Sequence, residues 1–155
     1  MAIAFKVNGQ AREVDAPDTA SLLDVLRNHL ALMGTRYGCG LEQCGSCMVL
    51  VDGKPVYACT REVGTVAGRG ITTVEGLGSK ERPHPLQQAF IDEQAAQCGY
   101  CINGMLMTAK ALLDHNPHPT DAKVREGLAL NLCRCGTFLR VRAAIKDAAG
   151  LGAEA

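Results

Sequence analysis

Eight cysteines are the residues of this chain best suited to chemistry, and their spacing divides them into two sets of four. The first set is Cys39, Cys44, Cys47 and Cys59, of which three lie in a single glycine-rich loop. A C-x4-C-x2-C loop with a distant fourth cysteine is typical of thiolate ligands to a [2Fe-2S] cluster. A structural zinc site also uses four thiolates, but zinc sites usually pair two short C-x2-C units. The spacing therefore favours an iron–sulfur cluster over zinc at the first set.

The second set is Cys98, Cys101, Cys133 and Cys135, which form a C-x2-C pair and a C-x-C pair between predicted helices. Helix N-termini just after Cys101 and Cys135 would direct backbone N–H groups toward an anionic cluster. The spacing alone is less specific than that of the first set, and it leaves open a redox-active C-x2-C pair or a zinc site. Because the same chain carries a predicted iron–sulfur site, a second [2Fe-2S] cluster is favoured.

Composition and charge narrow the classes of function. The formal net charge is zero, with 16 basic and 16 acidic residues, so nothing indicates nucleic acid or an anionic membrane surface as a partner. No apolar run approaches the ~20 residues of a membrane span, and the N-terminus lacks the pattern of a secretory signal. The tightly spaced cysteines favour thiolate ligation in a reducing compartment over disulfides. We expect a cytoplasmic chain with no membrane insertion, and export together with a partner subunit stays open.

The first half of the chain has the pattern of strands with one helix. Strands are predicted over residues 3–7, 10–14, 48–51, 54–58 and 71–74. Asn8-Gly9 is a preferred hairpin turn between the first two strands. Leucines at helical spacing over residues 22–30, preceded by the capping residue Ser21, predict a helix. This order of elements around a cluster loop predicts a β-grasp module of the plant-type ferredoxin kind.

The second half has helical periodicity and follows a polar linker, residues 76–85. Helices are predicted over residues 86–97, 103–116, 121–130 and 138–149. In the first of these, Leu86, Ala89, Phe90 and Ala96 are expected to point inward. Short amphipathic helices cannot bury their apolar faces separately, so we expect one small bundle. The predicted fold is α+β: an N-terminal β-grasp ferredoxin domain, residues 1–78, followed by a C-terminal four-helix bundle [2Fe-2S] domain, residues 79–155.

Taken together, these motifs resemble the small iron–sulfur subunit of the molybdenum hydroxylases, the xanthine oxidase and aldehyde oxidoreductase family, over nearly the whole chain. The paired signature C-x4-C-x2-C-x11-C and C-x2-C-x31-C-x-C is highly specific. The matching residues are Val7-Asn8-Gly9, Leu26-Arg27, the loop from Gly38 to Cys47, Asp52-Gly53, Cys59, the segment from Thr73 to Leu77, the segment from Gln97 to Cys101, and the segment from Asn131 to Cys135.

The resemblance implies an electron-transfer subunit of an oxidoreductase complex, without catalytic residues of its own. In that family the β-grasp cluster is the outer one, and the helical-domain cluster lies beside a molybdenum-pterin cofactor, here expected in its dinucleotide form, on a separate large subunit. By this likeness the first set binds the outer cluster and the second set binds the inner one. Gln97 and Cys135 fall where the family contacts the pterin. Hydroxylation of an N-heterocycle, or oxidation of an aldehyde, would take place on the large subunit.

Two stretches depart from the common pattern of the family. Ile102-Asn103-Gly104 stands where many relatives have Thr-Pro-Gly, and residues 136–140 replace a common Thr-Gly-Tyr. This variant resembles the isoquinoline 1-oxidoreductase alpha-subunit type, some of whose relatives pass electrons to cytochromes. A cytochrome c or an FAD-binding subunit therefore stays open as a further partner. The alternative function is a free-standing two-cluster ferredoxin, which the neutral charge and the large helical domain disfavour.

Overall fold

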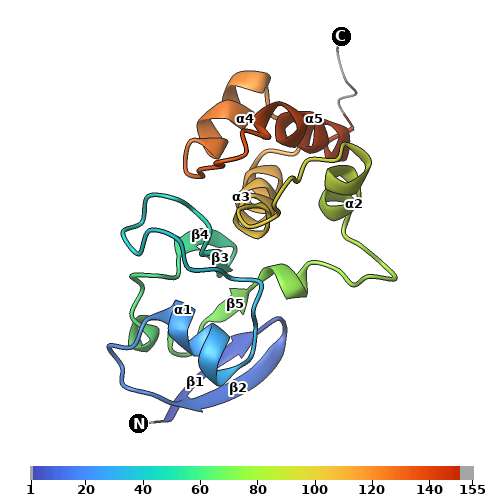
Figure 1. The fold of residues 1–155 in the computed structure, drawn as a ribbon. Coiled ribbons are helices and arrows are strands. Elements are labelled where there is room, and N and C mark those ends of the chain that lie inside the picture. Colours follow the sequence, from blue (N-terminus) through green and yellow to red (C-terminus); the bar gives the residue numbers. More distant parts are fainter. Residues whose placement is uncertain (1, 151–155) are drawn as a thin grey trace.

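The computed structural model describes residues 2–150, in which a β-sheet part and a helical part lie side by side (Figure 1). The strands of this range form one sheet in the order β2-β1-β5-β3-β4. Their bounds are β1 Ala2–Val7, β2 Gln10–Asp15, β3 Met48–Val51, β4 Lys54–Tyr57 and β5 Gly70–Thr72. β1 pairs with β5 in parallel, and the other neighbours are antiparallel. The sheet is therefore mixed.

The opening hairpin follows directly from its sequence. Asn8 and Gly9 both have positive φ, 51° and 79°, as the preferred two-residue hairpin turn requires. Val7 then pairs with Gln10, so that every second residue of β1 faces the core. Phe5, for example, is buried. The predicted hairpin is confirmed.

A short helical segment covers one face of the sheet. Helix α1 (Leu22–Asp24) begins after Ser21, whose hydroxyl accepts a hydrogen bond from the Asp24 N–H at 3.1 Å. The chain then continues as a π-helical turn over Val25–His29. Leu22 on this segment is fully buried against the sheet. The predicted helix over residues 22–30 is thus confirmed in position, with its second half wound more loosely than an α-helix.

Strand β3 lies between the two parts of the molecule and is buried along its whole length. Val49 and Val51 face the core shared with α1. Met48 and Leu50 face the opposite way and pack against Met107 of helix α3 (Ile102–His115). A strand that is covered on both faces needs an apolar residue at every position, which explains the unbroken run from Met48 to Val51.

The helical part has a core of its own. Its helices are α2 (Pro85–Asp92), α3, α4 (Asp121–Leu128) and α5 (Phe138–Ala148). Their apolar faces meet around Met105, Val124 and Val141, none of which is exposed. Figure 1 shows α3 facing the sheet, with α2, α4 and α5 around its other side. The α+β fold with a β-grasp ferredoxin module and a helical bundle is therefore confirmed.

The first helix of the bundle is shorter than predicted. α2 ends at Asp92 and not at Gln97, because Gln94 has a left-handed backbone with φ 49° that a helix cannot contain. The chain turns there, which buries Ala95 completely and leaves Ala96 exposed. The prediction that Ala96 points inward was wrong.

The predicted domain boundaries include Met1 and residues 151–155, which lie outside the described residues. Over residues 2–150, no helix is both long and apolar enough to cross a membrane.

Candidate metal centres

The loop of the first set is shaped so that backbone N–H groups point at sulfur. Cys39 Sγ accepts hydrogen bonds from the N–H groups of Leu41 and Gln43, both at 3.3 Å. Cys44 Sγ accepts one from the Cys39 N–H at 3.3 Å. Gly40 has a positive φ of 69°, which lets the chain curl back over the sulfur atoms. The loop thus presents donors to its own thiols, as a thiolate-bound cluster requires.

These donors and the degree of burial give the thiols of the first set different pKa values. The N–H groups of Leu41 and Gln43 lower the pKa of Cys39 to about 7. Burial raises the pKa of Cys47 to about 12, and only 2% of that residue is exposed. A buried thiol of this kind becomes a thiolate when a metal ion replaces its proton. The first set therefore joins a partly buried, readily ionised thiol to one that is almost fully buried.

Within each set the thiols are arranged in pairs. In the first set, Cys39 interacts with Cys44 and Cys47 with Cys59. In the second set, Cys98 interacts with Cys135 and Cys101 with Cys133. Among residues 2–150, no three His, Cys, Asp or Glu side chains are grouped as a site for a single metal ion. Two thiol pairs match a binuclear centre in which each iron takes two cysteines.

The second set lies at the junctions between helices. Cys101 caps α3 at its N-terminus, and α5 begins three residues after Cys135. Burial raises the pKa of Cys133, but hydrogen bonds from the hydroxyl and N–H groups of Thr137 outweigh it and lower that pKa to about 7. Burial raises the pKa of Cys101 to about 12. The structure thus places Cys98 near Cys135 and Cys101 near Cys133, at the junctions between helices.

The two sets are joined by direct backbone contact. The N–H of Leu132 donates to the carbonyl oxygen of Cys44 at 2.9 Å. Next to it, the buried side chain of Asn131 donates to the carbonyl oxygen of Gly45 at 3.4 Å. Gly104 of α3 lies so close to the same loop that an added Cβ would stand 2.0 Å from the Gly45 carbonyl oxygen. The loop of the first set is therefore pressed against the second half of the chain.

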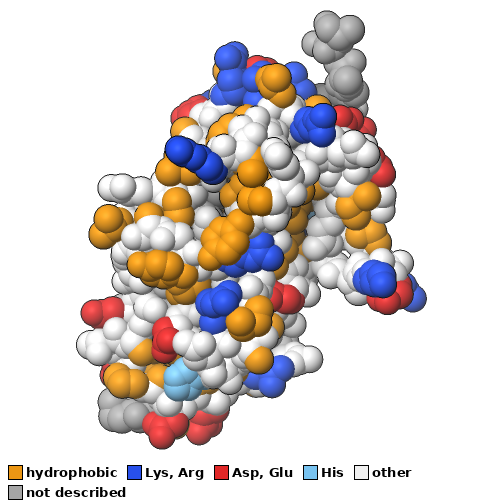
Figure 2. Space-filling view, viewed as in Figure 1, with side chains coloured by type: hydrophobic (Ala, Val, Ile, Leu, Met, Phe, Trp, Pro, Cys, Tyr) orange, Lys and Arg blue, Asp and Glu red, His pale blue; other side chains and the backbone are white. Residues whose placement is uncertain are grey.

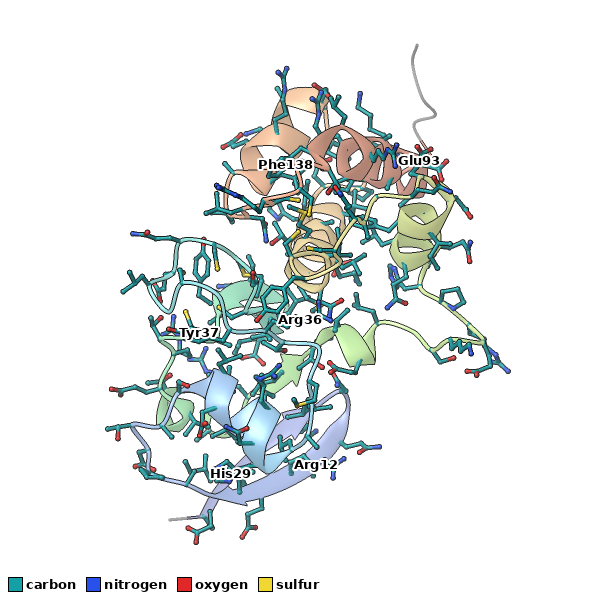
Figure 3. All side chains as sticks on the ribbon, viewed as in Figure 1. Arg12, His29, Arg36, Tyr37, Glu93 and Phe138 are labelled. Carbon is teal, nitrogen blue, oxygen red and sulfur yellow. The ribbon has the colours of Figure 1, made fainter. Side chains whose placement is uncertain are left out.

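A second contact between the two halves was not foreseen from the sequence. The Arg36 guanidinium donates to the carbonyl oxygens of Gly99 and Tyr100, at 2.7 and 3.2 Å. It also stacks over the Tyr100 ring, 5.2 Å from the ring centre. The Tyr100 hydroxyl in turn donates to the carbonyl oxygen of Tyr37. Figure 3 shows Arg36 between the sheet and α3. These partners are 63 or 64 residues apart in the chain, and no periodicity signals such a contact.

Gln97 and Cys135 lie at one surface hollow of about 420 Å³. Its other lining residues include Thr137, Leu139 and Arg140. Leu139 is 76% exposed, although it is a large apolar side chain. The two residues predicted to contact a pterin therefore share one concave surface next to the second set.

The comparisons with known proteins match both halves of the chain. Residues 5–69 match the model of the 2Fe-2S iron-sulfur cluster binding domain, and residues 73–146 match that of the [2Fe-2S] binding domain. The chain is 59% identical over 148 residues to a subunit of the nicotinate dehydrogenase of Pseudomonas putida, with 95% of this chain and 94% of the relative covered. It is 47% identical over 148 residues to the alpha subunit of isoquinoline 1-oxidoreductase of Brevundimonas diminuta, with 95% of this chain and 97% of the relative covered.

The chain belongs to the iron–sulfur subunits of the molybdenum hydroxylases. A solved structure of this family, quinoline 2-oxidoreductase from Pseudomonas putida 86, matches with a TM-score of 0.92 and 40% identity, over 96% of this chain and 92% of that chain. The iron–sulfur subunit is thus a component of an oxidoreductase complex, carries two [2Fe-2S] clusters and transfers electrons. Its partner is a large molybdenum-binding subunit with the molybdenum-pterin cofactor. The family membership favours the subunit over the free-standing ferredoxin.

Proposed function

We propose that Cys39, Cys44, Cys47 and Cys59 hold the outer [2Fe-2S] cluster, and that Cys98, Cys101, Cys133 and Cys135 hold the inner one. The observation that carries this proposal is the pairing of thiols in each set, with backbone N–H groups aimed at their sulfur atoms. We further propose that the chain divides near residue 78, between β5 and α2, so that each domain supplies one complete ligand set.

When bound, each cluster supplies a site that takes up and gives off one electron at a time. The chain itself contributes the surroundings. N–H donors at Cys39 and Cys98 stabilise negative charge on sulfur, while the burial of Cys47 and Cys101 excludes water. The contact of Leu132 with Cys44 fixes the two ligand sets relative to each other. The chain thus acts by placing the clusters and setting their reduction potentials, and it needs no acid, base or nucleophile.

We propose that the hollow lined by Gln97 and Cys135 receives the pterin of the large subunit. The side-chain amide of Gln97 offers both donors and acceptors, which suits the polar edge of a pterin. The exposed Leu139 beside it supports burial under the partner, because large apolar side chains are costly in water. Electrons then enter at the second set and leave from the first set.

The substrate is proposed from the relatives, and the final acceptor from the sequence variant at residues 102–104 and 136–140, which resembles the isoquinoline 1-oxidoreductase type. Their names include nicotinate, isoquinoline and quinoline enzymes, so we propose an N-heterocycle as the substrate of the large subunit. We propose a cytochrome c as the acceptor, and the competing possibility is an FAD-binding subunit. Assays of the purified complex with a panel of N-heterocycles and aldehydes, with cytochrome c or NAD as acceptor, test both points. Turnover of aldehydes alone, or with NAD alone, would contradict them.

Metal analysis tests the ligand assignment. Anaerobically purified complex should contain four irons and four acid-labile sulfides per iron–sulfur subunit. Cys39→Ser and Cys98→Ser should each abolish one of two distinct electron paramagnetic resonance signals and leave the other. His115→Ser, at an exposed position, is the control. Loss of the same signal in both cysteine variants would show that the sets are wrongly divided.

A further inference from the structure

The strongest unexplained feature near the second set is the side chain of Arg36. It belongs to the segment that leads into the first set, where its own N–H donates to the Ser46 carbonyl oxygen at 3.2 Å. Yet its guanidinium reaches across to the turn between Cys98 and Cys101. Arg36 is not one of the proposed metal ligands, so it can affect the second set only through its charge and its hydrogen bonds.

The peptide group between Gly99 and Tyr100 lies between the two cysteines of the turn and is bound by Arg36. Its carbonyl oxygen accepts the 2.7 Å hydrogen bond from Arg36. Its N–H is that of Tyr100, two residues after Cys98 and next to Cys101. A chain of one hydrogen bond and one peptide therefore runs from the guanidinium into the turn that holds Cys98 and Cys101.

Such a chain transmits polarisation. A cation at the carbonyl end draws electron density toward oxygen and makes the N–H at the other end a stronger donor. A stronger N–H donor to sulfur stabilises the more negative, reduced form of a thiolate-bound cluster. The guanidinium is also permanently charged, and its described partners here are carbonyl oxygens and an aromatic ring and not carboxylates. The polarised peptide and the positive charge of Arg36 both stabilise the reduced form of the cluster.

We propose that Arg36 raises the reduction potential of the cluster held by the second set, acting through the Gly99–Tyr100 peptide group. This rests on the proposed ligand assignment. Reduction adds one electron to the cluster, supplied in the experiment by dithionite, and no covalent bond forms or breaks. Arg36 is thus a positioning residue that makes the inner cluster a better electron acceptor, although it comes from the domain of the outer cluster.

The test is a redox titration of the complete complex, followed by the resonance signals of both clusters. In Arg36→Gln, the ratio of reduced to oxidised inner cluster at a fixed potential should fall about tenfold, which for a one-electron couple is about 59 mV. The ratio for the outer cluster should fall by less than about threefold. Arg36→Lys keeps the charge but not the planar group that lies over the Tyr100 ring, so it should give a smaller fall in the same direction. It decides the question alone if Arg36→Gln assembles poorly.

Arg12→Gln is the matched control, since Arg12 on β2 donates only to the nearby Gln10 side chain among the described residues. It should leave both ratios unchanged. An unchanged inner ratio in both Arg36 variants, or equal falls for both clusters, would overturn the proposal. So would the same fall in Arg12→Gln. If the wild-type complex itself lacked two signals or four irons per subunit, the ligand assignment would fail instead, which separates the two outcomes.

Discussion

The backbone N–H of Leu132 donates a 2.9 Å hydrogen bond to the carbonyl oxygen of Cys44 and so joins the two cysteine sets directly. Cys44 belongs to the first set, and Leu132 precedes Cys133 of the second. A through-bond path for an electron from one set to the other therefore crosses one hydrogen bond and otherwise follows covalent bonds. Figure 2 shows hydrophobic and basic side chains gathered over the middle of this face, where the sheet and helical parts meet.

Gly45 is predicted to be indispensable for this junction. An added Cβ would lie 2.3 Å from Asn131 Nδ2 and 2.6 Å from the Leu130 carbonyl oxygen, and φ is 76°. Gly53→Ala is the control, because φ there is 79° with open space around it. We expect Gly53→Ala to cost about 1–2 kcal/mol from backbone strain alone. Gly45→Ala should cost more and also lower the iron content, as measured by thermal unfolding and metal analysis. Equal effects of the two variants would argue against a crowded junction.

Two helical glycines are predicted to respond to alanine with opposite signs. Gly104→Ala drives a methyl group into the Gly45 carbonyl, so it should destabilise the fold by about 1–3 kcal/mol or more. Gly127 in α4 has only the Leu112 side chain near its added Cβ, at 3.4 Å. Gly127→Ala should therefore stabilise by about 0.5–1 kcal/mol through helix propensity. Chemical denaturation of both variants gives the sign, and a stable Gly104→Ala would disprove the close packing.

His84 is predicted to make stability depend on pH. Its Nδ1 accepts the Leu86 N–H at 3.2 Å and caps α2, which requires the neutral ring. Burial, and then the charge of Lys110, lower the pKa of His84 below its ordinary 6.5. The folded state thus binds fewer protons than the unfolded state near this pH. The contribution is full above pH 6.5 and is lost as the pH falls through the lowered pKa.

The measurement is the thermal unfolding midpoint of wild type and His84→Asn at several pH values on both sides of pH 6.5. Asparagine also caps helices but does not titrate. The midpoint of wild type should fall relative to that of the variant as the solution becomes more acidic. Parallel curves would show that His84 has no such role.

Removal of iron is predicted to loosen the helical part of the molecule. Cys101 and Cys133 are packed into the apolar core of α2 to α5, so the proposed ligation would tie the core to two interhelical junctions. The binding free energy of a structural metal centre is also folding free energy. Far-UV circular dichroism of the iron-free chain should show reduced helicity and a lower unfolding midpoint, both restored by reconstitution. Unchanged values would mean that the bundle is stable without its cluster.

Local patterns predicted most of the elements. Asn8-Gly9 fixed the first turn, and the apolar run from Met48 to Val51 marked a strand that is buried on both faces. The helix over residues 86–97 was predicted too long, because the left-handed conformation of Gln94 has no signal in the periodicity of apolar residues. Cysteine spacing predicts the two ligand sets, since ligand geometry restricts spacing strongly, and this assignment stays a prediction.

Contacts between the two halves could not be predicted in this way. Asn103 stood out in the sequence only as a departure from a common family pattern, and Gly104 only as the glycine that keeps to it. In the structure, Asn103 donates to the Gly34 carbonyl oxygen at 2.9 Å, and Gly104 makes room for Gly45. Arg36 gave no signal at all. Contacts of this kind depend on how the domains dock, which neither helical nor strand periodicity encodes.

The close approach of Gly104 to Gly45 has a consequence for speed. The rate of electron tunnelling falls steeply as the distance between redox centres grows. With a flexible hinge between the domains, transfer would occur only when the two centres happened to lie close together. No methyl group fits at this contact, and the hydrogen bonds of Leu132 and Asn131 to the same loop hold the two parts together. The packing of Gly45 against Gly104 thereby keeps the distance for electron transfer between the two clusters short and constant.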